Sequence, residues 1–268
     1  MHRFRCTSIE EKLKECEGDG VLLIGIGGGG DILGTIPTSF LAKSLGKRTV
    51  FGGITWERFT VDPTPGPRHI LDIVGVEEFG EYVGLVASGC QTKDGVALQV
   101  CSFADWSSEK VVAIDPSCGP KNLGEELAKL MEELDLDLII GIDGGGDVLA
   151  KGDEDSLWSP LADSLMLASL EEVRKRGYEA ILAVFGAGCD GELQQETVLE
   201  YIGEIAEKGG YLGARGLSSE EADVVLSASR LVVSEANVLP ALAAKGKRGD
   251  VKIRGGTRTV KLTVTSSI

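Results

Sequence analysis

The stretch Leu22-Leu-Ile-Gly-Ile-Gly-Gly-Gly-Gly-Asp-Ile-Leu33 decides the fold, because a near copy of it occurs later as Leu138-Ile-Ile-Gly-Ile-Asp-Gly-Gly-Gly-Asp-Val-Leu149. Nine of the twelve positions are identical, and the one change that is not between aliphatic residues is Gly27 for Asp143. Each copy reads as a buried strand, a glycine-rich turn and an acid that opens the next segment. This arrangement is typical of a ligand-binding loop at the carboxyl end of a parallel strand.

The two copies remain similar beyond their glycines. Each is followed by a helical pattern with an early proline (Pro37 or Pro160), then by a strand that ends in Phe-Gly (Phe51 or Phe185). We interpret the two halves as a duplicated βαβ unit. Because strands and helices alternate along the chain, we predict a three-layer Rossmann-like α/β fold, with a mainly parallel sheet and helices on both faces.

Periodicity and turn signals place the remaining elements. We expect residues 1–268 to form a single α/β domain, with a basic hairpin-like extension over residues 245–268. We also expect an N-terminal helix capped by Ser8, a helix opened by Ser159 as N-cap, and a β-hairpin of residues 81–88 with 96–101. The other expected strands are 21–26, 48–54, 111–114, 136–142 and 180–185, and the other expected helices are 36–46, 122–134, 192–208, 219–233 and 235–244.

Charge and hydropathy narrow the function. The net charge of −15 lacks the basic footprint of a duplex-binding protein, so we expect no nucleic-acid partner. No apolar run approaches the roughly 18 residues that span a bilayer, so we expect no membrane insertion. Residues 245–261 are nevertheless basic. This end either docks on the acidic body or supplies a cation to an anionic ligand.

The six cysteines show neither a CxxC pair nor zinc-ligand spacing. We therefore expect reduced thiols in a cytoplasmic protein. Cys189 lies close to an expected helix start, where a thiol can become nucleophilic. Asp190 and Glu192 oppose that activation, so a small filler residue is favoured.

Three strands end in loops that combine glycine with acids. Because the carboxyl ends of parallel strands share one edge of a sheet, we expect these loops to face one crevice. Asp31, Asp147 and Asp190 are candidate catalytic residues and candidate Mg²⁺ ligands, since Mg²⁺ prefers oxygen ligands. The candidate ligand-binding residues of these loops are Gly28, Gly29, Gly30, Asp31, Asp143, Gly144, Gly145, Asp147, Gly188, Asp190 and Glu192.

Two other interpretations of these loops stay open. Gly25, Gly27 and Gly30 satisfy the GxGxxG pattern of dinucleotide-binding folds, but Asp31 would repel a pyrophosphate. Alternatively the aspartates cap helices and the glycines form tight packing turns.

A proline-rich segment, Thr55 to Ile70, has no periodicity and is long for a loop in a compact domain, which indicates a functional loop. His69 is its candidate acid–base residue. Arg58 and Arg68 flank Asp62, and they either order the loop by ion pairing or join Arg254 in binding an anionic ligand.

Four motifs together resemble a known family: Gly-Gly-Gly-Gly-Asp31, Trp56-Glu-Arg58 with Asp62-Pro-Thr-Pro-Gly-Pro-Arg68, Asp143-Gly-Gly-Gly-Asp147, and Gly188-Cys-Asp-Gly-Glu-Leu193. The chain is similar to a mostly archaeal family that is catalogued only as a domain of unknown function. The resemblance covers nearly the whole chain. It implies a Rossmann-like α/β domain and a thermophilic source, and it carries no activity or catalytic residue.

The leading hypothesis is an enzyme that acts on a small polar metabolite. A more specific version of it has a phosphorylated substrate and a reaction assisted by Mg²⁺. The alternatives are a non-catalytic small-molecule-binding or regulatory protein, a nucleotide-binding Rossmann-like protein, and a structural homo-oligomer whose loops have lost their ligand.

Overall fold

The computed structural model describes residues 7–268. The strands are β1 (Gly20–Gly25), β2 (Arg48–Ile54), β3 (Ile73–Val74), β4 (Glu77–Glu78), β5 (Val83–Val86), β6 (Gln91–Thr92), β7 (Val111–Ile114), β8 (Leu138–Gly144), β9 (Glu179–Phe185), β10 (Gly249–Ile253) and β11 (Arg258–Leu262). The α-helices are α1 (Ile9–Glu15), α2 (Thr35–Ser44), α3 (Gln99–Ser107), α4 (Pro120–Glu133), α5 (Pro160–Lys175), α6 (Gln195–Glu207), α7 (Ser219–Ala228) and α8 (Glu235–Ala244). Of the short 3₁₀ helices, η1 (Gly29–Gly34) and η4 (Asp147–Leu149) matter below.

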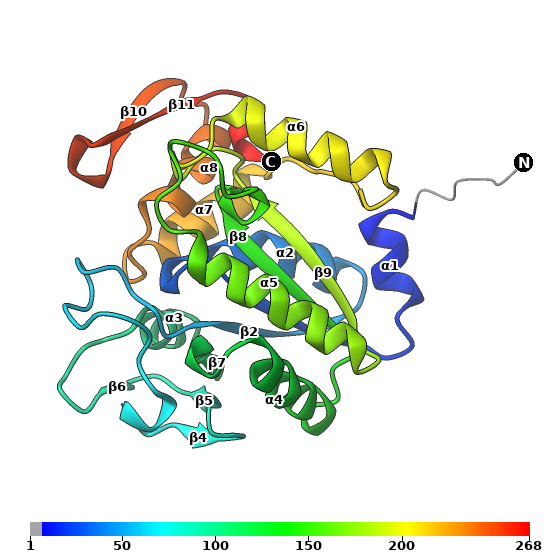
Figure 1. Ribbon diagram of the computed structural model, residues 1–268, viewed down its shortest axis with the longest axis vertical. Helices are drawn as coiled ribbons and strands as arrows, with labels where there is room; N and C mark the ends of the chain where they lie inside the picture. Colours follow the sequence, from blue (N-terminus) through cyan, green and yellow to red (C-terminus); the bar gives the residue numbers. More distant parts are fainter. Residues whose placement is uncertain (1–6) are drawn as a thin grey trace, which may run out of the picture.

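A seven-stranded sheet forms the middle layer, in the order β4-β5-β7-β2-β1-β8-β9 (Figure 1). The strands from β7 to β9 in this order are parallel, whereas β4 and β5 are antiparallel additions at one edge. The two copies of the repeated sequence are β1 and β8, and they lie side by side with Leu23 opposite Ile140. The prediction of an α/β fold with a mainly parallel sheet is confirmed.

Helices cover both faces of this sheet. Alternate residues of β1 point to opposite sides, so Leu23 joins one apolar core with α2, α3 and α7, and Leu22 joins another with α4 and α5. The chain leaves β1 through α2 toward β2, and it leaves β8 through α5 toward β9. The two connections therefore diverge on opposite faces, starting from the centre of the sheet.

The predicted elements agree well in the central strands and helices. Strands β2 and β7 and helix α8 have the expected bounds, and the C-terminal pair β10–β11 is an antiparallel hairpin. Ser8 caps α1 as expected, through a hydrogen bond to its side chain from the Glu11 N–H. The N-cap position of α5 is Ser159, but its hydroxyl donates to Glu192 instead of capping the helix.

The expected hairpin of residues 81–88 with 96–101 is wrong. Strand β5 pairs with β4 and β7 instead, and the second segment runs into α3, which begins at Gln99. Val100, Cys101, Phe103 and Ala104 are all buried, which is the spacing of a helix face, although Val96 to Cys101 alone resembles a strand. Packing of these side chains against the sheet decided the local conformation over strand propensity.

The expectation of reduced thiols is wrong for two cysteines, because Cys90 and Cys101 form a disulfide. The prediction rested on the absence of CxxC and zinc-ligand spacing, and a sequence separation of 11 matches neither pattern. Cys16, Cys118 and Cys189 are free thiols, and Cys6 lies outside the described residues. Burial raises the pKa of Cys189 to about 12, which agrees with a filler residue and not a nucleophile.

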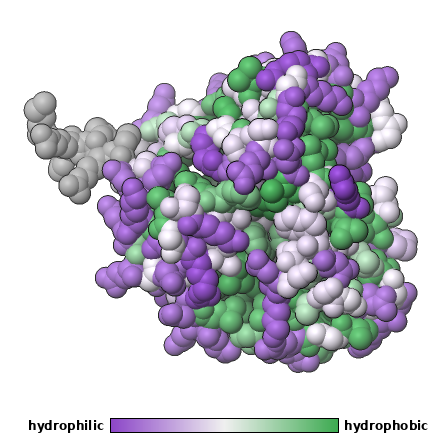
Figure 2. Space-filling model, turned by 180° about the vertical axis from the view of Figure 1, so that it is seen from behind, coloured by the Kyte–Doolittle hydropathy of each residue, from purple (hydrophilic) through white to green (hydrophobic). Residues whose placement is uncertain are grey.

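No helix in the described part of the chain is both long and apolar enough to cross a membrane. On the face behind that of Figure 1, hydrophilic and apolar side chains are interspersed (Figure 2).

Candidate functional site

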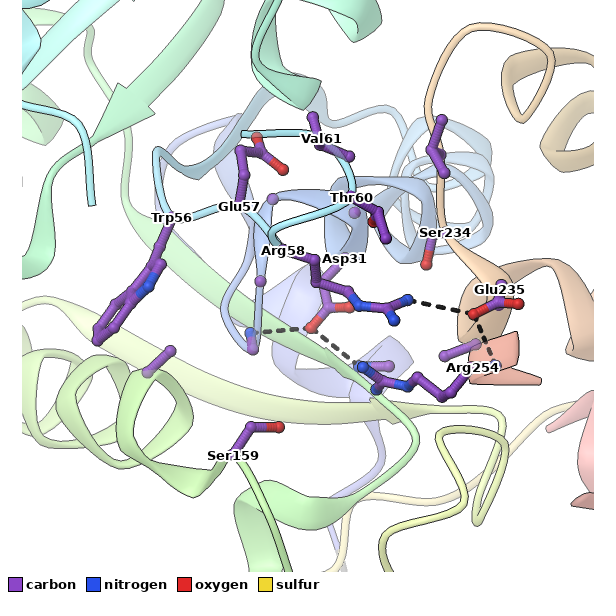
Figure 3. A pocket seen from close by; sticks show the side chains of 18 of the residues that line it. Asp31, Trp56, Glu57, Arg58, Thr60, Val61, Ser159, Ser234, Glu235 and Arg254 are labelled. Atoms are coloured by element: carbon purple, nitrogen blue, oxygen red, sulfur yellow. Dashed lines mark hydrogen bonds and ion pairs between the residues drawn. The ribbon is translucent and has the colours of Figure 1, made fainter. Parts of the chain in front are cut away.

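The loops that follow β1 and β8 flank a pocket of about 390 Å³ (Figure 3). It lies where the chain diverges from two neighbouring parallel strands, which is the position at which α/β sheets bind ligands. We call it the loop pocket. Its walls come from the first glycine loop, the loop that follows β2, the start of α5 and the segment before α8, and it is lined by Gly27, Gly28, Gly29, Gly30, Asp31, Trp56, Glu57, Arg58, Thr60, Val61, Gly144, Asp147, Trp158, Ser159, Leu161, Ala162, Val233, Ser234, Glu235, Ala236 and Arg254.

Asp31 links the two glycine loops at the floor of this pocket. Its Oδ2 accepts the Gly27 N–H at 2.8 Å and the Gly144 N–H at 3.3 Å, and its Oδ1 accepts from Asn237 Nδ2 at 2.8 Å. Burial raises the pKa of Asp31 to about 6, and these hydrogen bonds hold it from rising further. A single carboxylate thus fixes β1, β8 and α8 relative to one another.

Two further carboxylates lie against Asp31. Asp143 accepts from the N–H groups of Gly146 and Val148 with Oδ2, whereas its Oδ1 has no hydrogen-bond donor among the described residues. Asp163, in the first turn of α5, has an Oδ1 that is likewise without a donor. Oxygens of the three side chains lie within 4.8 Å of one another. We call Asp31, Asp143 and Asp163 the acidic cluster.

Burial and mutual repulsion both act on this cluster. Asp143 and Asp163 are each 1% exposed. Burial, followed by the neighbouring carboxylates, raises the pKa values of both well above the usual range. The three groups cannot all stay charged without a cation, because like charges disfavour ionisation at such distances.

The other acids of the glycine loops lie outside this group of three. Asp147 lines the pocket, and burial together with Asp143 raises its pKa to about 11. Asp190 packs against Gly145, and burial raises its pKa to about 7. Of the predicted metal ligands Asp31, Asp147 and Asp190, only Asp31 therefore belongs to the acidic cluster.

Glu192 ties two loops together. Its carboxylate accepts the N–H groups of Trp158 at 2.8 Å and Ser159 at 3.0 Å, and also the Ser159 hydroxyl at 2.6 Å. Helix α6 therefore begins at Gln195, after the expected start at Glu192. Glu192 does not line the loop pocket, and neither do Gly145, Gly188 and Asp190.

Two arginines bring positive charge to the pocket (Figure 3). Arg58 Nη1 lies 3.2 Å from Glu235 Oε2, and the same oxygen accepts the backbone N–H of Arg254 at 3.0 Å. Arg254 has a φ of +56°, a left-handed conformation that is costly for a residue with a Cβ. The C-terminal hairpin thus contributes Arg254 to the pocket, while Arg258 fixes the hairpin to the body over the Trp158 ring.

Arg68 and His69 have other partners. Arg68 binds Asp62 at 2.5 Å and Asp94 at 2.8 Å, which orders the proline-rich loop. His69 accepts the Leu71 N–H and packs edge-on against Tyr82. Neither residue lines the loop pocket.

Three residues of the site had no assignment from the sequence. Glu57 lines the pocket, and its Oε1 accepts the Gln99 N–H at 2.7 Å. Burial raises the pKa of Glu57 to about 8. Glu57 and Asp163 belong to segments that showed no glycine loop, and Asn237 is one polar residue in an apolar helix. That polar position in α8 was the one signal available for Asn237.

The fold and the pocket define an α/β protein with a pocket at the carboxyl ends of two neighbouring parallel strands, where the connections leave on opposite faces of the sheet. The chain belongs to the family described as "Protein of unknown function (DUF1152)", whose model matches residues 22–268. Comparison with curated proteins and with solved structures found no match.

Proposed function

We propose that this protein is an enzyme that binds a small anionic metabolite in the loop pocket and acts on it by proton transfer. The observation that carries the proposal is the meeting of two guanidinium groups and a buried carboxyl group of near-neutral pKa in one pocket. A volume of about 390 Å³ is at the lower end of the range for small-molecule sites.

The anionic character of the ligand follows from Arg58 and Arg254. Guanidinium groups pair with carboxylate or phosphate oxygens in planar, bidentate geometry. Glu235 accepts hydrogen bonds from the Arg58 guanidinium and from the backbone N–H of Arg254, which keeps the two residues beside one another at the pocket wall. The Arg254 guanidinium itself lies 3.9 Å from Glu192 Oε1. The Gly28 N–H also lies at the pocket and donates to no other described residue. An anion between these groups would receive three sets of donors.

The proton-transfer role falls to Glu57. A general acid or base works best when its pKa is close to the ambient pH, and burial brings Glu57 to about 8. The Gln99 N–H holds one carboxyl oxygen. Its other oxygen makes no hydrogen bond to a described residue, so it is available to a ligand.

Thermal-shift measurements with phosphate monoesters, small carboxylates and nucleotides, each with and without Mg²⁺, test the binding step. Gly28→Leu is the blocking variant, because a Cβ at Gly28 meets no atom within 4 Å and the side chain would extend into the pocket. Gly203→Leu, at an equally open position on α6, is the matched control. We expect a bound ligand to raise the Tm of the wild type and of Gly203→Leu by several degrees, and to leave Gly28→Leu unchanged. A shift that persists in Gly28→Leu would contradict binding in this pocket.

Turnover of the ligand found in this way separates an enzyme from a binding protein. Glu57→Gln should retain the thermal shift and lose activity by about 100-fold or more, which is the usual contribution of a general acid or base. If the wild type binds the ligand and never converts it, the protein is a binding or regulatory protein. A shift with dinucleotides alone would favour nucleotide binding.

A further inference from the structure

We propose that the acidic cluster binds one hard divalent cation such as Mg²⁺, Mn²⁺ or Ca²⁺, held by oxygens of Asp31, Asp143 and Asp163 beneath the loop pocket. This site does not depend on the identity of the metabolite. Its ligands also differ from the set Asp31, Asp147 and Asp190, which the sequence of the glycine loops suggested.

The three carboxylates converge on one point. A Cβ built on Gly27 would lie 2.4 Å from Asp163 Oδ1, 2.5 Å from Asp31 Oδ2 and 3.1 Å from Asp143 Oδ1. The oxygens thus surround the space beside Gly27 instead of turning toward solvent. In the second copy of the repeat the same position is Asp143 itself. The one non-conservative difference between the copies therefore leaves space on one strand and supplies a carboxylate from the other.

Two of these oxygens have no N–H or hydroxyl donor among the described residues, so their near neighbours in the cluster are other carboxylates. Asp143 Oδ1 and Asp163 Oδ1 are buried and receive no hydrogen bond from a described residue. None of the three side chains forms an ion pair with a described lysine, arginine or histidine, and the Arg254 guanidinium at the pocket pairs instead with Glu192 Oε1 at 3.9 Å. A buried carboxylate without a donor or counter-charge is costly, so such oxygens usually bind an ion or carry a proton.

The donor set selects the class of ion. All three ligands are carboxylate oxygens, which suit Mg²⁺, Mn²⁺ and Ca²⁺ and not the softer metals that prefer sulfur or imidazole. Ligands on opposite sides of these ions lie about 4 to 5 Å apart, which is twice the metal–oxygen distance. The separation of at most 4.8 Å fits this range. Gly27 and Asp31 also line the loop pocket, so water or a ligand oxygen can complete the coordination shell from that side.

Direct binding to the full-length protein, stripped with EDTA and free of metabolite, tests the site. Titration with MgCl₂, MnCl₂ and CaCl₂ by calorimetry should give one site for at least one of the ions. At a hundredfold excess over Kd, Tm should rise by about 5 to 10 °C. Mn²⁺ bound to the protein should also lose its free-ion electron paramagnetic resonance signal. Absence of binding for all three ions would overturn the proposal.

Asp163→Asn is the decisive variant because it keeps the size of the side chain and removes one ligand charge. We expect its affinity for the cation to fall at least tenfold, while its Tm without metal equals or exceeds that of the wild type, since one repelling charge is gone. Asp190→Asn is the matched control, because Asp190 is also buried with an unpartnered oxygen but lies outside the cluster. It should bind the cation as the wild type does. Unchanged affinity in Asp163→Asn would place the bound cation outside the acidic cluster and overturn the proposal. If Asp163→Asn does not fold, Asp143→Asn replaces it with the same expected loss.

Discussion

The disulfide between Cys90 and Cys101 should contribute about 3 kcal/mol to the free energy of unfolding. It closes a loop with a sequence separation of 11, and the chain-entropy relation gives about 9 cal/mol/K for a loop of that size, or about 3 kcal/mol at 25 °C. Both sulfurs are largely buried, at 8% and 0% exposure of their residues, so reduction should act mainly on the unfolded chain.

Urea unfolding with and without a phosphine reductant measures this contribution on the same chain. For an m-value of about 3 kcal/mol/M, the midpoint should fall by about 1 M when the reductant is present. Thiol counting in denaturant should find two more thiols in the reduced protein. Cys118→Ala is a suitable control because Cys118 is a free thiol, and the variant should keep the full effect of the reductant. A midpoint change below about 0.3 M, or about 1 kcal/mol at this m-value, would refute the reasoning from loop closure.

Three further predictions concern charge, backbone strain and helix propensity. Burial raises the pKa of Glu57 from 4.5 to about 8, so the folded state holds this proton more tightly than the unfolded state does. The free energy of unfolding should therefore fall as pH rises from about 5 to 8, and it should fall by about 1 kcal/mol per pH unit more in the wild type than in Glu57→Gln. Stability that changes equally with pH in the two proteins would contradict this assignment. Arg254→Gly should leave the free energy of unfolding within about 1 kcal/mol of the wild type, because glycine accepts the left-handed backbone, yet it should weaken binding of an anionic ligand at least tenfold in calorimetry; retained affinity would remove Arg254 from the site. Gly203→Ala should stabilise the protein by about 1 kcal/mol in urea unfolding, since Gly203 is an exposed position within α6 and its Cβ would meet nothing; a loss of stability would mean that this helix tolerates no side chain there.

The parallel strands of the sheet and the helices that connect them could be predicted, because each of these segments has a clear pattern of apolar residues in its own sequence. Val111–Ile114 is a short apolar run between polar residues, and α8 is an apolar helix preceded by Ser234 as its N-cap. These signals lie within one segment of the sequence, so they can be recognised without knowing which segments pack against it. The duplication also predicted that β1 and β8 would carry matching loops, and the sheet places them side by side.

The residues that the sequence missed are those whose importance depends on distant contacts. Asp163 could be recognised only once α5 was placed against the two glycine loops, because in sequence it is one acid in an amphipathic helix. Glu192 showed the opposite problem. It stands in a motif that resembles the other acidic loops, but the N–H groups of Trp158 and Ser159 occupy its carboxylate. The pairing of Cys90 with Cys101 joins a loop to helix α3, and cysteine spacing alone could not reveal that contact.

The unequal residues at Gly27 and Asp143 mean that the two copies of the repeat cannot exchange their sequences independently. Aspartate at both positions would place a methylene among the carboxylates, within 2.4 Å of Asp163 Oδ1, and glycine at both would remove one of the three acids. Each residue is therefore acceptable only in the presence of the other, which is epistasis between sites on adjacent strands.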